Sequence, residues 1–185
     1  MNRCHITDRR ALGGVEPLLA RIAVNDAAGV ELIQIREKDL SARALCELVS
    51  RAVALCQQAR VIVNTRVDVA LACGAHGVHL PAHSPAPNEF RRIVPPGFVI
   101  GVSCHDLDEL RAAESEGADY ALFAPVFHPL SKIDPRKPIG LDGLRAACMS
   151  VRLPVYALGG ITVESAPDCV QAGAAGIAGI TLFQS

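Results

Sequence analysis

The fold is decided by one stretch, Leu32-Ile33-Gln34-Ile35-Arg36-Glu37-Lys38, and by the helical run Ser41–Gln58 that follows it. The first stretch alternates apolar and polar residues with the period of two that is typical of a β-strand. The second repeats apolar residues every three or four positions, and Ser41 is a suitable N-cap. Together they predict one strand–helix unit, and similar units follow each other along the chain.

Short β-branched segments alternate with alanine- and leucine-rich segments through all 185 residues. Strands are expected at Cys4–Asp8, Leu32–Glu37, Val61–Asn64, Gly77–Leu80, Val99–Ser103, Tyr120–Pro125, Val155–Leu158 and Gly176–Leu182. Further helices are expected at Glu16–Ala28, Val67–Cys73, Asn88–Ile93, Asp106–Glu116, Leu141–Met149 and Val163–Ala172. Eight strands predict an α/β fold, a (βα)8 TIM barrel forming a single domain over residues 1–185. A doubly wound open sheet is the alternative, although the first strand lacks the Gly-rich loop typical of that fold.

The barrel is expected to be short, because the sequence stops three residues after the last predicted strand and leaves no final helix. We therefore expect apolar groups to lie uncovered on the outer side of the last and first strands. A second copy of the chain would cover them, which predicts a homo-oligomer.

The amino-acid composition argues against two classes of binding partner, nucleic acids and anionic membranes. Lys plus Arg number 18 and Asp plus Glu 19, so the formal net charge of −1 predicts binding to neither nucleic acid nor an anionic membrane. Apolar stretches are far shorter than a bilayer span and no signal-peptide core is visible, so we expect a cytoplasmic protein. The seven cysteines include no CxxC pair and are expected to be reduced thiols.

The alternation in the deciding stretch also predicts a binding site. Gln34, Arg36 and Lys38 share one face of the strand, and Ile33 and Ile35 share the other. If the isoleucines pack against helices, the polar residues point into the barrel toward its C-terminal mouth, where active sites of this fold lie. Two cations that converge on a cavity predict an anionic ligand.

Other predicted strands end in polar residues at the same mouth. Asn64 ends the third strand, His79 lies near the end of the fourth, and Ser103-Cys104-His105 lie at the end of the fifth. The glycine pair Gly159-Gly160 follows the seventh strand, and Gly179 belongs to the eighth. Backbone amides in these late loops often hold a phosphate in this fold.

Seven motifs stand at these strand ends, in this order: Ile6-Thr7-Asp8, Gln34-Ile35-Arg36-Glu37-Lys38, Asn64-Thr65-Arg66, Gly77-Val78-His79-Leu80, Gly101-Val102-Ser103, Pro125-Val126-Phe127 with Ser131-Lys132, and Gly159-Gly160-Ile161. The series resembles the thiamine-phosphate synthase/TenI family over essentially the whole chain. The resemblance implies a barrel that joins an aminopyrimidine pyrophosphate to a thiazole phosphate and releases pyrophosphate, with help from Mg²⁺.

The resemblance also implies roles for individual residues. It assigns pyrophosphate and pyrimidine binding to Gln34, Arg36, Lys38 and Asn64, further pyrophosphate contacts to Ser103, Ser131 and Lys132, and thiazole-phosphate binding to Gly159, Gly160 and Gly179. Lys38 and Lys132 are therefore candidate catalytic residues, because ionisation of a pyrophosphate needs fixed positive charge around the leaving oxygens.

The chain departs from the family pattern at the metal site. Both aspartates that hold Mg²⁺ in the synthase are missing, since Thr65 and Pro81-Ala82-His83-Ser84 occupy their places. A hard cation prefers carboxylate oxygens, so no metal ligand and only weak Mg²⁺-dependent synthase activity are expected.

The other branch of the family, TenI, is a thiazole tautomerase that moves a proton without a metal. His128, on the loop after the sixth strand, is the candidate acid–base residue for that chemistry. His79 is expected to be structural or to contact substrate, whereas His83 and His105 are expected to be solvated.

Two alternatives from other classes remain. A non-catalytic, regulatory barrel would keep the phosphate pocket and lose the metal carboxylates. A phosphosugar isomerase would need a carboxylate base at a strand end, and Glu37 faces away from the cavity in the predicted register. A catalytic thiol at Cys104 is not expected, because Cys104 follows the inward Ser103 and points outward.

Overall fold

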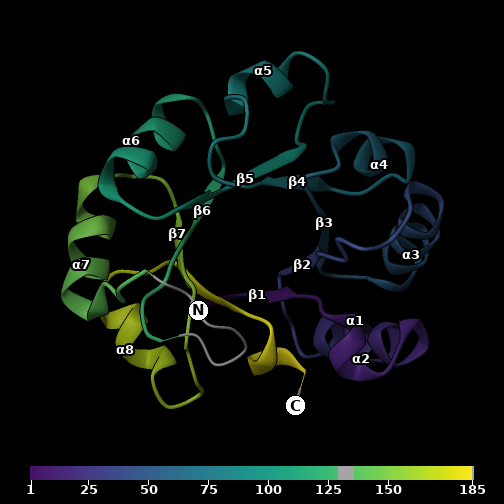
Figure 1. The fold of residues 1–185 in the computed structure, drawn as a ribbon, viewed down its shortest axis with the longest axis horizontal. Coiled ribbons are helices and arrows are strands. Elements are labelled where there is room, and N and C mark those ends of the chain that lie inside the picture. Colours follow the sequence, from purple (N-terminus) through teal and green to yellow (C-terminus); the bar gives the residue numbers. More distant parts are fainter. Residues whose placement is uncertain (129–135, 185) are drawn as a thin grey trace.

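The computed structural model describes residues 1–128 and 136–184. Within them, eight parallel strands form a closed barrel in which each strand pairs with its neighbours in sequence and β8 pairs with β1. Figure 1 shows the strands around the centre and the helices as an outer ring. The predicted TIM barrel is therefore confirmed, and the open doubly wound sheet is excluded.

The elements lie close to the predicted segments. The strands are β1 (Asn2–Ile6), β2 (Leu32–Ile35), β3 (Arg60–Asn64), β4 (Gly77–Leu80), β5 (Val99–Cys104), β6 (Tyr120–Phe123), β7 (Val155–Ala157) and β8 (Gly176–Gly179). The helices are α1 (Arg9–Leu12), α2 (Val15–Ala27), α3 (Ala42–Leu55), α4 (Val67–Ala72), α5 (Pro87–Arg91), α6 (Leu107–Ser115), α7 (Gly140–Ser150), α8 (Ala166–Gln171) and a 3₁₀ turn, η1 (Thr181–Phe183). In the part of the chain that is described, no helix combines the length and the apolar character needed to cross a membrane.

Alternate residues of β2 point into two different apolar layers, one between the strands and the helices and one inside the barrel. Ile33 and Ile35 are buried in the layer between strands and helices, as predicted. Inside the barrel lies a separate cluster, formed by Cys4, Ile6, Leu32, Ile62, Val99, Tyr120, Leu122, Tyr156 and Ala178. Tyr120 fits there because β5 carries Gly101, where a Cβ atom would lie 2.1 Å from Cζ of the tyrosine. The large ring of Tyr120 therefore requires a glycine at position 101.

The outer side of β8 and β1 is covered, which corrects the expectation of an apolar patch there. Ile177 of β8 and His5 of β1 are buried, with exposed fractions of 3% and 0%. Phe183 of η1 packs 5.9 Å from the His5 ring, centroid to centroid, and its carbonyl accepts a hydrogen bond from Asn25 of α2. The segment expected to continue β8 to residue 182 turns instead after Gly179 and brings Phe183 over this seam.

The expectation that all seven cysteines are thiols is wrong for one pair. Cys46 of α3 and Cys73, which follows α4, form a disulfide with a Cα–Cα distance of 6.1 Å. The two helices pack side by side, so the pair meets across a boundary that sequence spacing does not reveal. The remaining cysteines, Cys4, Cys56, Cys104, Cys148 and Cys169, are free.

Asp26 joins the end of α2 to the segment before β3. Its buried carboxylate accepts hydrogen bonds from the backbone N–H groups of Gln57, Gln58 and Ala59, at 3.0, 3.0 and 2.6 Å. Burial acts to raise the pKa of Asp26, but the three hydrogen bonds to the charged form outweigh it, so the pKa lies below the usual value. The ionised carboxylate therefore stabilises the folded state.

We expect Asp26→Ala to lower the free energy of unfolding at pH 7 by about 1.5–3 kcal/mol, the range for hydrogen bonds to a charged group. The effect should shrink as the pH falls through the lowered pKa, because the folded state then gains the proton that the unfolded state already holds. Urea denaturation across a pH series measures both quantities. Asp142→Ala, at a fully exposed site on α7, is the control and should cost little. A loss for Asp26→Ala that does not depend on pH would contradict this account.

Candidate functional site

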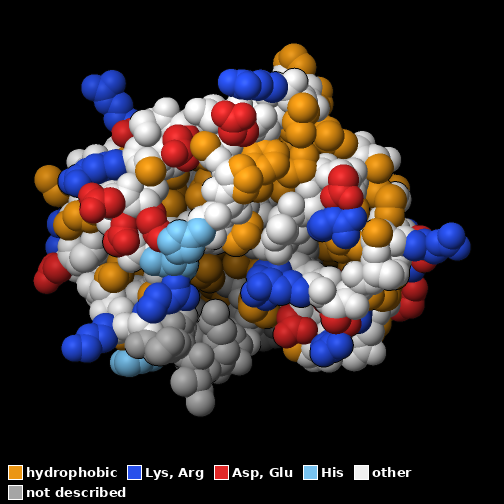
Figure 2. All heavy atoms as spheres, turned by 45° about the horizontal axis from the view of Figure 1, so that its top comes forward, with side chains coloured by type: hydrophobic (Ala, Val, Ile, Leu, Met, Phe, Trp, Pro, Cys, Tyr) orange, Lys and Arg blue, Asp and Glu red, His pale blue; other side chains and the backbone are white. Residues whose placement is uncertain are grey.

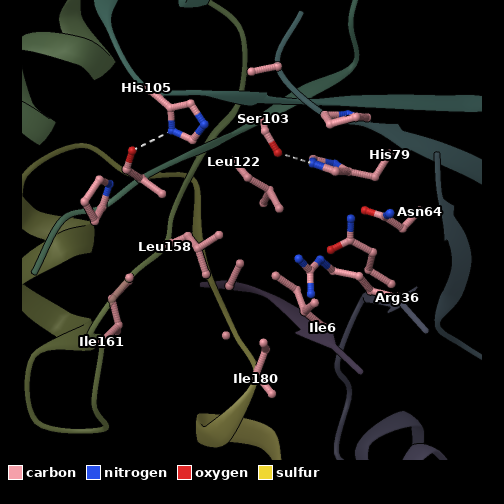
Figure 3. A pocket seen from close by; sticks show the side chains of 18 of the residues that line it. Ile6, Arg36, Asn64, His79, Ser103, His105, Leu122, Leu158, Ile161 and Ile180 are labelled. Atoms are coloured by element: carbon pink, nitrogen blue, oxygen red, sulfur yellow. Dashed lines mark hydrogen bonds between the residues drawn. The ribbon is translucent and has the colours of Figure 1, made fainter. Parts of the chain in front are cut away.

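A cavity of about 400 Å³ opens at the C-terminal ends of the barrel strands. Its described polar lining consists of Gln34, Arg36, Lys38, Asn64, Thr65, His79, Ser103, His105, Arg136 and Thr181. Apolar side chains, among them Leu122, Leu158 and Ile161, form the opposite wall (Figure 3). Side chains from strands far apart in the sequence therefore meet in one pocket.

Most of the predicted site residues line this pocket. They are Gln34, Arg36, Lys38, Asn64, His79, Ser103, Gly159, Gly160 and Gly179. His128 is exposed and is not among the described lining residues. Ser131 and Lys132 lie outside the described residues. The structure thus brings the strand-end residues together in one pocket.

Gln34 is the deepest polar side chain contributed by β2. It is 1% exposed, and its Oε1 atom has no hydrogen-bond partner among the described groups. A buried amide oxygen without a partner costs free energy, which a donor on a bound ligand would recover. Gln34 is therefore prepared to accept a hydrogen bond from an N–H or O–H group of a ligand.

The loop that carries Arg36 and Lys38 is held from behind by Glu37. Thr7 donates from Oγ1 to Glu37 Oε1 at 2.7 Å, and Thr7 Oγ1 accepts from the Arg36 backbone N–H at 2.9 Å. The Arg9 guanidinium pairs with Glu37 Oε2 at 3.0 Å. Glu37 does not line the pocket, in agreement with its predicted outward orientation. Its hydrogen bonds hold the backbone segment that carries Arg36 and Lys38.

His79 and Ser103 form a hydrogen-bonded pair on adjacent strands. His79 Nε2 lies 2.8 Å from Ser103 Oγ, and His79 Nδ1 lies 3.1 Å from the hydroxyl of Tyr120 (Figure 3 shows the first bond). Burial, with a smaller contribution from the charge of Arg36, lowers the pKa of His79 to about 3. The ring is therefore neutral near pH 7 and has both nitrogens engaged within the protein.

His105 lies on the pocket wall, which corrects its predicted solvated position. Its Nδ1 lies 2.8 Å from the carbonyl oxygen of Ala124. Because a carbonyl only accepts, Nδ1 carries the proton of the neutral ring and Nε2 carries a lone pair. Figure 3 shows this hydrogen bond as the dashed line from the His105 ring. The strand period contained the signal, since His105 stands two residues after the inward Ser103.

The glycine pair after β7 lets two loops approach closely. Gly159 and Gly160 have φ values of 99° and 65°, in the left-handed region. A Cβ atom on Gly160 would lie 2.3 Å from the backbone oxygen of His128, and one on Gly159 would lie 2.9 Å from Cα of Pro125. Any side chain at these positions would separate the β6 and β7 loops where they border the pocket.

The donor set does not suit a magnesium ion held by the protein. No Asp or Glu is among the described lining residues, and no group of three His, Cys, Asp or Glu residues within the described ranges could hold a metal. At the position of the first expected ligand, Thr65 accepts a hydrogen bond from Asn64 Nδ2 at 2.8 Å. Its φ of 67° is unfavourable for a β-branched residue.

Among the residues that the structure describes, the charged side chains lining the pocket are all cationic. Arg36, Lys38 and Arg136 border it without a described carboxylate among the lining residues. In the space-filling view, Lys or Arg and His side chains lie on two sides of a hollow in the middle of the molecule (Figure 2). A low-dielectric cavity bordered by cations attracts an anion such as phosphate.

Comparisons with known proteins show which family the chain resembles over nearly its whole length. A model of the family described as Thiamine monophosphate synthase matches residues 4–183. The chain is 43% identical to a putative thiamine-phosphate synthase of Geobacter sulfurreducens, over 94% of this chain and 82% of the relative. It is 44% identical to a thiamine-phosphate synthase of Methanoculleus marisnigri, over 88% and 77%. A solved thiamine phosphate pyrophosphorylase from Pyrococcus furiosus superposes with a TM-score of 0.83 at 35% identity, covering 100% of this chain and 88% of that one.

We expect Arg36→Ala to weaken the binding of inorganic pyrophosphate by about one to two powers of ten in Kd, as for the loss of a charge-assisted hydrogen bond. Calorimetric titration measures this change. Arg66→Ala is the matched control, because Arg66 pairs with Asp68 on the surface and does not line the pocket. Equal affinity in the Arg36→Ala and Arg66→Ala proteins would place the anion elsewhere.

Proposed function

Because the chain belongs to the thiamine-phosphate synthase family, we propose that its pocket binds two phosphorylated thiamine precursors and joins them. The chain is an enzyme of the thiamine-biosynthesis type, and a non-catalytic barrel is not favoured. One observation carries the proposal: Gln34, Arg36 and Lys38 meet Asn64 and Ser103 in a single cationic pocket. Its substrates would be an aminopyrimidine pyrophosphate and a thiazole phosphate.

Each group has a task in such a reaction. The thiazole nitrogen forms a bond to the pyrimidine methylene carbon, and the bond from that carbon to the pyrophosphate oxygen breaks. Negative charge therefore grows on the leaving pyrophosphate. Arg36 and Lys38, which line the pocket, would stabilise that charge. The unpartnered Oε1 of Gln34 suits the amino group of an aminopyrimidine. The loop at Gly159 and Gly160, across the pocket, would hold the phosphate of the thiazole.

Magnesium would neutralise part of the pyrophosphate charge when bound. Thr65 and Ser84 supply no carboxylate for it, and the side chain of Ser84 donates instead to the Pro81 carbonyl at 2.8 Å. We therefore propose that this protein depends mainly on its own cations and responds weakly to added Mg²⁺.

A second candidate function is proton transfer on a thiazole phosphate, as in the TenI branch. It is supported by His105, which lines the pocket and uses Nδ1 for the Ala124 carbonyl, so that Nε2 is left for a ligand. The two candidates differ in their substrate requirement. Joining consumes both precursors, whereas proton transfer changes the thiazole phosphate alone.

A cytoplasmic location and a homo-oligomer also remain proposals. The five free cysteines support a reducing compartment, whereas a disulfide such as Cys46–Cys73 is more typical of an oxidising one. With the seam between β8 and β1 covered, support for an oligomer comes from exposed apolar side chains near α7 and α8, namely Met149, Val163 and Val170.

The substrate requirement and the response to magnesium are tested together by following product formation from both precursors at increasing Mg²⁺. We expect activity that Mg²⁺ raises only slightly in the natural protein. Thr65→Asp, alone or with Ser84→Asp, should increase the Mg²⁺-dependent part, and Asp also tolerates the left-handed backbone better than Thr.

Thr65→Asn is the control, because it suits the same backbone conformation without adding charge. Strong Mg²⁺ dependence of the natural protein, unchanged in Thr65→Asp, would show that the metal site forms without these carboxylates. Turnover of the thiazole phosphate alone, with no joined product, would support proton transfer instead.

A further inference from the structure

A buried polar chain runs from the pocket into the barrel interior. Ser103 Oγ lies 2.8 Å from His79 Nε2, and His79 Nδ1 lies 3.1 Å from the hydroxyl oxygen of Tyr120. His79 and Tyr120 are only 1% and 3% exposed, whereas Ser103 borders the cavity. Each of the three groups can donate or accept, so the chain has two proton arrangements with opposite polarity at Ser103.

His79 and Tyr120 are both uncharged, and this limits the hydrogen-bonded group to two proton arrangements. Burial lowers the pKa of His79 to about 3, so the imidazole is neutral with one N–H group and one lone pair. Burial also raises the pKa of Tyr120 well above its usual value, so the phenol keeps its proton. Because both side chains are buried, their hydrogen bonds must be made within the group of Ser103, His79 and Tyr120.

In the first arrangement Tyr120 donates to Nδ1, Nε2–H donates to Ser103, and the serine proton is available to the pocket. In the second, Ser103 donates to Nε2 and Nδ1–H donates to Tyr120. The phenolic proton then needs another acceptor, and among the described residues His79 is the only hydrogen-bond partner recorded for that hydroxyl. An unpaired buried hydroxyl is costly, so the first arrangement has the lower free energy.

We propose that Tyr120, acting through His79, fixes Ser103 as a hydrogen-bond donor toward an anion in the pocket. Tyr120 and His79 are positioning residues, and only Ser103 touches the ligand. The inference rests on the proposed function for one point, that the ligand is anionic. With its hydroxyl fixed as a donor, Ser103 would favour ligands that place an acceptor oxygen beside it, such as a pyrophosphate oxygen.

The fold holds Tyr120 in the required place. The absence of a side chain on Gly101 leaves the space that the Tyr120 ring fills, and Tyr156 packs edge-on against that ring with 5.5 Å between centroids. Tyr156 also supplies a matched control. Its hydroxyl lies 3.2 Å from the side-chain amide of Asn2, outside the polar chain.

The proton arrangement is read directly by long-range ¹H–¹⁵N correlation NMR of the intact protein labelled with ¹⁵N-histidine. We expect His79 to be the Nε2–H tautomer at neutral pH. An Nδ1–H tautomer would overturn the proposal, whatever the protein binds.

The consequence for binding is measured by titrating inorganic pyrophosphate. Tyr120→Phe should weaken binding about three- to tenfold, the range for one hydrogen bond, whereas Tyr156→Phe should leave it unchanged. In the Ser103→Ala background, Tyr120→Phe should cause no further loss, because its effect passes through the serine.

Equal affinities of the two phenylalanine variants, or a full additional loss in the Ser103→Ala background, would overturn the proposal. If the natural protein bound no pyrophosphate, the proposed function would fail, and the tautomer of His79 would still decide whether Tyr120 sets the polarity of Ser103. The two failures are thus distinguishable.

Discussion

Closure of the parallel barrel is the constraint on which the rest of the structure depends. With β8 paired to β1, the sheet has no open edge, and alternate residues of each strand point either to the helices or to the interior. All strands run the same way, so their C-terminal ends meet around one opening. A polar residue near the end of an inward-facing series is thereby brought into one cavity with its counterparts from distant segments. Arg36 and Ser103 meet in this way.

The cavity depends in turn on what fills the barrel beneath it. Tyr120 occupies space that Gly101 leaves open, and its hydroxyl reaches His79, which contacts Ser103 at the pocket wall. Glu37 serves the neighbouring wall by holding the backbone that carries Arg36. Packing below the site and hydrogen bonds behind it therefore orient the side chains that face a ligand, and a pocket without described carboxylates can present donors and positive charge to an anion.

Features that follow local periodicity could be predicted from the sequence, and features made by packing could not. The eight strand–helix repeats correctly predicted the barrel, and the alternation around Gln34 correctly predicted the inward face of β2. The Cys46–Cys73 disulfide and the cover that Phe183 gives to β1 and β8 join segments that no motif connects. His105 could have been found from its two-residue spacing to Ser103, but a histidine beyond a strand end has no fixed direction until its acceptor is known.

The central claim is that the polar face of β2 and the end of β5 form one anion site at the barrel mouth. A crystal structure of the protein with pyrophosphate bound tests it most directly. The account predicts the anion in the mouth, within hydrogen-bond distance of Arg36, Lys38 and the Ser103 hydroxyl. Pyrophosphate bound outside this cavity, with these three side chains uninvolved, would contradict it.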